Sequence, residues 1–93
     1  MSNSNKKPYN PSLCDTSAFF VPHKEANYLN AQDVVYTLVN SAKNISIATR
    51  NCFEDGKELA VKGEVVADLI CELQIKLEMI EKILPLAFEG EGA

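Results

Sequence analysis

The sequence lacks most of the residues on which metal and cofactor sites depend. It has no tryptophan, one histidine (His23) and three cysteines that share no Cys-x-x-Cys spacing. Two-metal helical bundles need Glu-x-x-His pairs, and structural zinc sites need closely spaced Cys and His ligands. Nucleophilic catalysis needs a base beside the nucleophile, and no serine or cysteine lies in such a motif. We therefore expect that the protein is not an enzyme and holds no metal or cofactor.

Basic residues and long apolar runs are also scarce. The chain has 9 Lys and Arg against 13 Asp and Glu, a formal net charge of -4. Clustered basic residues supply the affinity for phosphate backbones, so we expect no nucleic-acid partner. No run reaches the roughly 18 apolar residues of a membrane span, and no secretory signal precedes the odd number of cysteines. These absences favour a cytoplasmic protein without membrane contact.

Hydrophobic residues make up 46% of the 93 residues, and they follow a helical period. In the second half of the chain they alternate at spacings of four and three, which is the seam of a long amphipathic helix. That seam consists of Leu59, Gly63, Val66, Ile70, Leu73, Leu77, Ile80 and Leu84. The pattern predicts a helix over residues 57–84, ending there because Pro85 cannot continue the hydrogen-bond ladder.

A second helical pattern covers residues 31–53. Its seam consists of Ala31, Val35, Leu38, Ala42, Ile45, Thr49 and Cys52. Asn30 is the expected N-cap, because its side chain can accept a hydrogen bond from the amide three residues later. Residues 45–49 also alternate with period two and are β-branched, which is typical of a strand. The unbroken helical spacing on both sides favours the helix.

A break at residues 54–57 separates the two patterns. Gly56 there suits a tight turn, and a short connection between long helices makes them antiparallel neighbours. The sequence therefore predicts an all-α fold, an antiparallel two-helix hairpin within one domain over residues 18–88. Residues 1–17, with Pro8 and Pro11, are expected to be a mobile leader, and residues 89–93 a frayed acidic tail.

The apolar arc of the second helix is wider than one partner helix covers, at about 140° for 100° per residue. We expect two hairpins to associate as a homodimeric four-helix bundle. The predicted dimer face consists of Val34, Leu38, Ile45, Ala48, Val65, Leu69, Leu73 and Ile83. In the alternative, the run from Phe19 to Val21 folds back and covers this flank within one chain.

The outer side of the second helix is the candidate partner-binding surface. An apolar stripe inside an acidic frame is typical of a surface for a basic amphipathic partner. The stripe and frame consist of Glu64, Asp68, Cys71, Glu72, Ile75 and Met79. Ordinary solvation is the alternative, because the pairs Glu58–Lys62, Glu72–Lys76 and Glu78–Lys82 have the favourable helical order of an acid four residues before a base.

The order of parts is similar to that of short bacterial proteins of unknown function that form helical hairpins. An Asn, Ser and Pro-rich leader, a Phe-Phe-Val run, a helix with small residues, an Asp-Gly turn and a second helix carry this resemblance over residues 18–84. It implies no activity. The predicted function is a protein-binding module, an adaptor, regulator or inhibitor, that acts as a homodimer. The alternative is a bundle that binds a small apolar ligand in room left by Ala42, Thr49 and Gly63.

Overall fold

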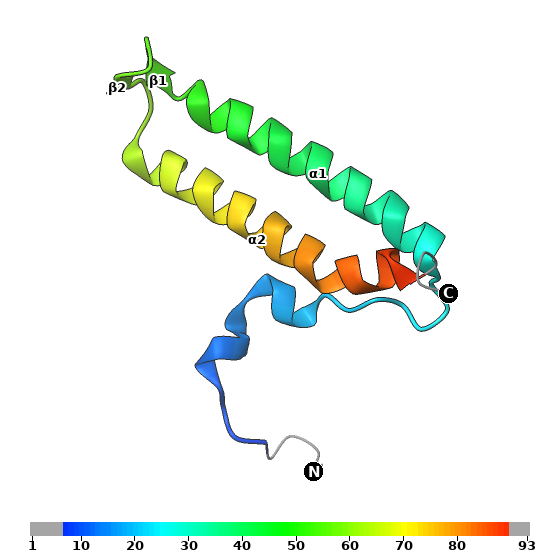
Figure 1. Ribbon diagram of the computed structural model, residues 1–93. Coiled ribbons are helices and arrows are strands. Elements are labelled where there is room, and N and C mark those ends of the chain that lie inside the picture. The colour runs from blue at the N-terminus through cyan, green and yellow to red at the C-terminus, as the bar shows by residue number, and fades with distance from the viewer. Residues whose placement is uncertain (1–6, 90–93) are drawn as a thin grey trace.

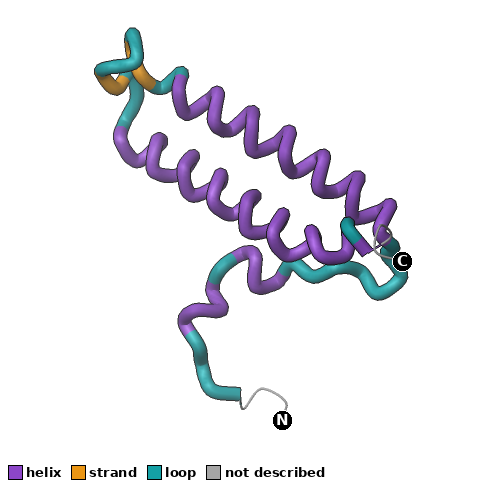
Figure 2. Tube along the Cα trace, viewed as in Figure 1, coloured by secondary structure: helices purple, strands orange, loops and turns teal. Residues whose placement is uncertain are grey.

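A computed structural model describes residues 7–89 as a helical hairpin preceded by an N-terminal segment (Figure 1). Helix α1 spans Tyr28–Arg50 and helix α2 spans Gly63–Ala87. The short strands β1, Phe53–Glu54, and β2, Glu58–Leu59, connect them. The two helices run side by side in opposite directions, with the strands at the far end (Figure 2). The predicted all-α hairpin is confirmed, with a small two-stranded sheet added to it.

Helix α1 begins one turn earlier than the sequence predicts. Asn27, and not Asn30, is its N-cap: the Asn27 side chain accepts hydrogen bonds from the amides of Leu29 and Asn30. The Asn30 side chain accepts in return from the Asn27 amide at 3.0 Å. This reciprocal capping box satisfies backbone donors that a helix start otherwise leaves without partners. Asn30 therefore completes the cap from inside the helix.

The connection between the helices is a β-hairpin. Asp55 and Gly56 both have positive φ angles, 52° and 71°, and the Lys57 amide donates to the Glu54 carbonyl at 2.9 Å. An Asp-Gly pair with this geometry matches the twist of antiparallel strands, so Phe53 pairs with Leu59. Phe53 of β1 and both residues of β2 were predicted to be helical, whereas Glu54 was predicted to lie in the break. Hence α1 ends at Arg50 and not at residue 53, and α2 begins at Gly63 and not at residue 57.

Helix α2 continues past Pro85 to Ala87, against the predicted end at Leu84. Proline has no amide to donate to the Glu81 carbonyl and its ring crowds that turn, which bends a helix rather than always ending it. Figure 1 shows α2 changing direction in its last turns. Two contacts hold the extra turn: Ala87 is buried, and the Gln32 side chain donates to the Ala87 carbonyl at 3.0 Å.

The seam between the helices uses the predicted residues of α1 but a different stripe of α2. Every predicted seam residue of the first pattern is buried or half-buried. On α2, Ile83 and Ala87 are the buried residues, whereas Ile70 and Leu77 of the predicted seam are half exposed. Leu59 lies in β2 and is exposed. Helix α2 is thus rotated about its axis relative to the predicted orientation.

The molecule is flat. Its principal extents are 50 × 44 × 17 Å and its radius of gyration is 17.7 Å, against about 12 Å for a compact domain of this length. No large side chain among the described residues is fully buried. A single layer of two helices cannot enclose a core, because each helix has a neighbour on one side only.

The N-terminal segment, residues 7–27, includes the described part of the predicted leader and has local structure. It contains two 3-10 helices, η1 at Pro11–Cys14 and η2 at Thr16–Phe19. Helix η2 lies against the outer edge of α2, and the chain then runs along the hairpin to the start of α1 (Figure 1). Residues 1–6 of the predicted leader and 90–93 of the predicted acidic tail lie outside the described residues.

Candidate functional site

The N-terminal segment is fastened to α2 through Ser17. Its hydroxyl donates to Glu78 Oε1 at 3.1 Å, and Ser17 is only 8% exposed. The other carboxylate oxygen, Oε2, accepts from the Gln74 side chain at 3.0 Å. Glu78 is therefore oriented by its own helix before the segment arrives, because Gln74 fixes one oxygen and leaves the other for the hydroxyl. A hydrogen bond to a charged acceptor is stronger than one between neutral groups.

Beyond Ser17, the segment closes a cavity over the ends of both helices. The cavity has a volume of about 190 Å³. Its lining is mostly apolar and comes from Phe20, Val21, Pro22, His23, Ala26, Asn30, Ala31, Val34, Ile83 and Leu86. Ile83 is only 4% exposed and forms part of the floor. The cavity therefore exists because the segment crosses from α2 to α1, and neither helix forms it alone.

The predicted partner-binding surface is divided by this docking. Ile75 and Met79 are half-buried and lie on the side of α2 that carries Glu78, whereas Cys71 is exposed farther along the helix. Glu64, Asp68 and Glu72 are all exposed. The predicted Glu72–Lys76 pair is present at 3.1 Å. Two other predicted pairs differ: Glu58 lies in β2 and not in a helix, and Glu78 accepts from Gln74 and Ser17.

The opposite side of the hairpin carries large apolar residues that no described segment covers. We call it the open face and define it by Tyr28, Val39, Ile70 and Leu77. Val39, Ile70 and Leu77 are 49%, 53% and 50% exposed. On each helix the two members are seven or eleven residues apart, which places them within about 20° of each other at 100° per residue. The open face therefore follows both helices along their length.

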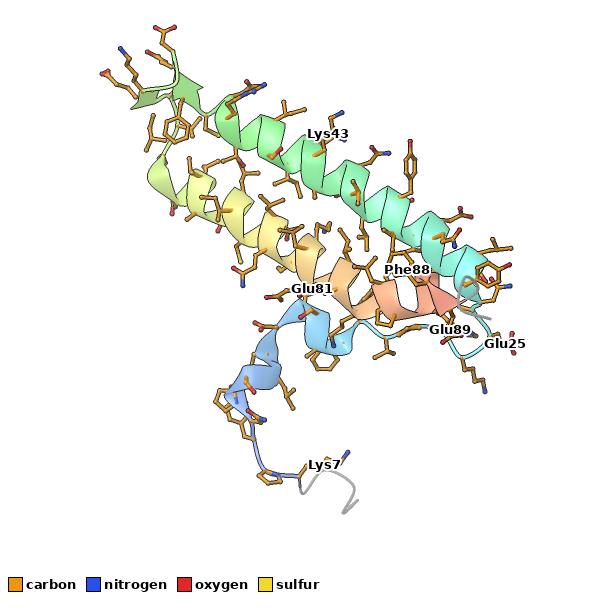
Figure 3. All side chains as sticks on the ribbon, viewed as in Figure 1. Lys7, Glu25, Lys43, Glu81, Phe88 and Glu89 are labelled. Atoms are coloured by element: carbon orange, nitrogen blue, oxygen red, sulfur yellow. The ribbon has the colours of Figure 1, made fainter. Side chains whose placement is uncertain are left out.

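Charged residues border the open face with opposite signs on the two helices. Lys43 and Arg50 follow Val39 on α1 by four and eleven residues, and Glu81 follows Leu77 on α2 by four. All three are exposed. Figure 3 shows Lys43 and Glu81 pointing away from the seam between the helices. The α1 border is thus basic and the α2 border is acidic.

The residues of the predicted dimer face do not share one environment. Leu38 and Ile83 are buried within the single chain, which leaves them little surface to offer a partner. Ile45, Leu69 and Leu73 are half-buried. Val34, Ala48 and Val65 are exposed, and Val34 also lines the cavity. The N-terminal segment therefore reaches one end of this face through Phe20. Phe19 and Val21, the other members of the run that the alternative folds back, are 82% and 71% exposed.

The residues predicted to make room for a ligand lie elsewhere. Ala42 is buried in the seam, the Thr49 hydroxyl donates to the Ile45 carbonyl at 2.8 Å, and Gly63 is exposed at the first turn of α2. None of the three lines the cavity. Sequence reasoning missed the cavity because it depends on where the N-terminal segment lies, although the Phe-Phe-Val run was recognised as needing a docking surface.

The remaining chemical feature of residues 7–89 is a contact between Tyr9 and Cys14. A hydrogen bond of 3.2 Å to the Cys14 thiol raises the pKa of the Tyr9 phenol above its ordinary value. In this part of the chain no three Cys, His, Asp or Glu side chains gather as metal ligands would. Within the same residues, neither helix is sufficiently long and apolar to span a bilayer.

Comparison of the chain with protein-family models, with curated proteins and with solved structures found no match.

Proposed function

We propose that this chain is a protein-binding module that acts as a homodimeric four-helix bundle. The open face carries the proposal, in place of the dimer face predicted from the sequence, whose Leu38 and Ile83 are buried within the single chain. Aliphatic side chains that are half exposed along two helices are costly to leave in water, at about 25 cal/mol for each Å² of apolar surface. A second hairpin packed on this face would bury them and supply the second layer that two helices lack.

The surface area of the chain supports this proposal. The solvent-accessible surface is 7331 Å², whereas a folded monomer of 10.3 kDa exposes about 5,400 Å² by the general scaling with mass. The excess is about 1,900 Å² by the same relation, and a specific dimer of standard size buries about 800 Å² on each partner. This excess includes the surface of the exposed N-terminal segment, and it is larger than the area that one partner of such a dimer buries.

The charges at the border fit a second copy of the chain. In a two-fold arrangement, α1 of one protomer packs over α2 of its partner, and the same contact occurs twice. The basic border formed by Lys43 and Arg50 then meets the acidic border formed by Glu81. Such complementarity steers association and fixes orientation. Among the described residues, no ion pair joins Lys43 or Arg50 of α1 to Glu81 of α2. Lys43 and Glu81 point outward from the hairpin (Figure 3).

Light scattering coupled to size-exclusion chromatography tests the dimer. At micromolar concentration we expect twice the 10.3 kDa mass of the chain. Leu77→Asp is expected to halve that mass, because it places a charge at the centre of the apolar contact. Leu29→Asp is the matched control: Leu29 is exposed to a similar degree, but it lies on the outer side of α1. A monomeric wild-type chain, or dissociation by both variants alike, would contradict the proposal.

The cavity favours a second candidate function, the binding of a small apolar ligand. Its volume of about 190 Å³ exceeds the roughly 150 Å³ of an apolar cavity that accepts benzene. Mass spectrometry of the purified protein under native and then denaturing conditions tests this candidate. A small molecule released in a fixed ratio to the chain supports it, and a chain that carries no such molecule contradicts it.

A further inference from the structure

The N-terminal segment is held in place in the way that a short peptide is held by a receptor. Among residues 7–27 only Ser17 is buried, and Ala18, Phe20 and Ala26 are half-buried. Phe19 is 82% exposed, although it stands between Ala18 and Phe20. The contact therefore includes one polar anchor at Ser17 and one aromatic anchor at Phe20, whereas Phe19 between them faces solvent.

Each anchor meets a feature that the hairpin supplies. The Ser17 hydroxyl donates to Glu78 Oε1, which Gln74 has already oriented through Oε2. Three residues later, Phe20 lines the cavity together with Ile83 and Leu86 of α2 and with Ala31 and Val34 of α1. The η2 turn sets this spacing, because the Phe20 amide donates to the Ser17 carbonyl at 3.2 Å. We name Glu78 with these four cavity residues the docking groove.

We propose that the docking groove is a peptide-binding site, and that the N-terminal segment is its occupant within the same chain. The partner class is a protein segment in which a serine or threonine precedes an aromatic residue by three positions. The hydroxyl would replace that of Ser17 at Glu78, and the aromatic ring would replace that of Phe20 at the wall of the cavity. This inference rests on the proposed protein-binding function and names the chemistry of its partner.

Because the occupant is tethered, it competes with any free segment. A short tether gives an effective concentration in the millimolar range. A partner binds only to the fraction of molecules in which the groove is open, so its apparent dissociation constant is the intrinsic constant divided by that open fraction. Weakening the tethered occupant without altering the groove is therefore expected to strengthen binding of the same sequence supplied as a separate peptide.

Fluorescence anisotropy with the full chain tests the proposal. The probe is a labelled synthetic peptide of residues 15–25. Two variants release the occupant while leaving Glu78 and the cavity residues of both helices intact: Ser17→Glu, which repels Glu78, and Phe20→Ala, which removes the ring that forms one wall of the cavity. Each is expected to bind the probe at least tenfold more tightly than the wild-type chain. Phe19→Glu is the matched control, since its side chain faces solvent, and it is expected to bind like the wild type.

The peptide itself supplies the second control. A probe that lacks the hydroxyl and the ring, through Ser17→Ala and Phe20→Ala, is expected to lose binding to both opened variants. Equal binding of the two probes, or no gain in affinity in either opened variant with unchanged helical circular dichroism, would overturn the proposal. Light scattering on the same samples distinguishes failure of the groove proposal from failure of the dimer proposal. An opened variant that keeps twice the chain mass but fails to bind the probe contradicts the peptide-binding groove and leaves the dimer standing.

Discussion

The two sides of the hairpin have similar apolar residues but different coverage. On the side that carries the docking groove, the chain's own N-terminal segment lies over α2 through one hydrogen bond and one aromatic ring. The open face has larger exposed aliphatic side chains, and no described segment lies over it. A contact with few anchors is readily exchanged, whereas a continuous aliphatic face favours a permanent partner. This difference suits the docking groove to exchange of one peptide segment for another, and the open face to association with a second chain.

The largest effect on stability is expected at a residue of the seam, on which both sides of the hairpin depend. Leu38 is buried in the seam beneath them. Leu38→Ala is expected to lower the free energy of unfolding by about 2–5 kcal/mol, the range for deleting a buried leucine side chain. Urea denaturation followed by circular dichroism measures it. Ile47→Ala, on the outer side of α1, serves as the control. Equal losses in the two variants would mean that Leu38 is not part of the core.

The same substitution on the two sides is expected to have opposite consequences. Ile70→Asp, on the open face, should abolish the dimer while the N-terminal segment stays docked. Ile75→Asp, on the side of Glu78, should leave the dimer intact and release the segment. Light scattering measures the first property, and the rate of tryptic cleavage after the exposed Lys24 measures the second. If Ile75→Asp dissociated the dimer and Ile70→Asp did not, the two sides would have been assigned the wrong way round.

A smaller effect is expected from the polar anchor of the docked side. Glu78→Ala removes the acceptor of the Ser17 hydroxyl, and a hydrogen bond to a charged group contributes about 1.5–3 kcal/mol. The lost hydrogen bond is expected to weaken docking of the N-terminal segment and to leave the stability of the helical hairpin unchanged. Hydrogen exchange should therefore accelerate at the amides of Ala18 and Phe20, which are bonded within η2. Unchanged exchange there, or faster exchange throughout α1, would refute the anchor.

The smallest effect concerns an acidic residue of the predicted partner surface that lies away from both contacts. Glu72→Gln breaks the exposed pair with Lys76. Exposed pairs four residues apart in a helix contribute about 0.3–0.5 kcal/mol. The thermal midpoint should fall only slightly, and by less at high salt, because salt screens the pair. A large loss that salt did not reduce would show that Glu72 has a structural role.

Local signals in the sequence predicted the features that depend on neighbours in the chain. The seam of α1 was predicted residue by residue, because its small and β-branched residues leave one narrow apolar stripe. The turn at Gly56 and the Glu72–Lys76 pair were also predicted. The helix ends were less accurate, since Asn27 with Asn30 and Asn30 with Asp33 present similar capping patterns one turn apart.

The hydrophobic periodicity of the sequence could not predict the rotation of α2 about its own axis. Its apolar arc is wide enough for several stripes to face α1, so the pattern admits both the predicted seam and the observed one. In the structure, the stripe that contains Ile83 and Ala87 is buried, and Ile70 and Leu77 are exposed. Pro85 lies inside the helix, and Gln32 of α1 donates to the Ala87 carbonyl beyond it, a contact between distant segments that no local rule anticipates.

By itself, the sequence determined that the chain forms two amphipathic helices joined by a tight turn, because periodicity and turn chemistry act between residues close in the chain. Only the tertiary structure decided which stripe of α2 is buried, that the N-terminal segment lies against α2, and that Ser17 meets Glu78 across 61 positions. Those outcomes depend on packing between distant segments, where several apolar surfaces compete for the same partner. The open face and the docking groove both result from that competition.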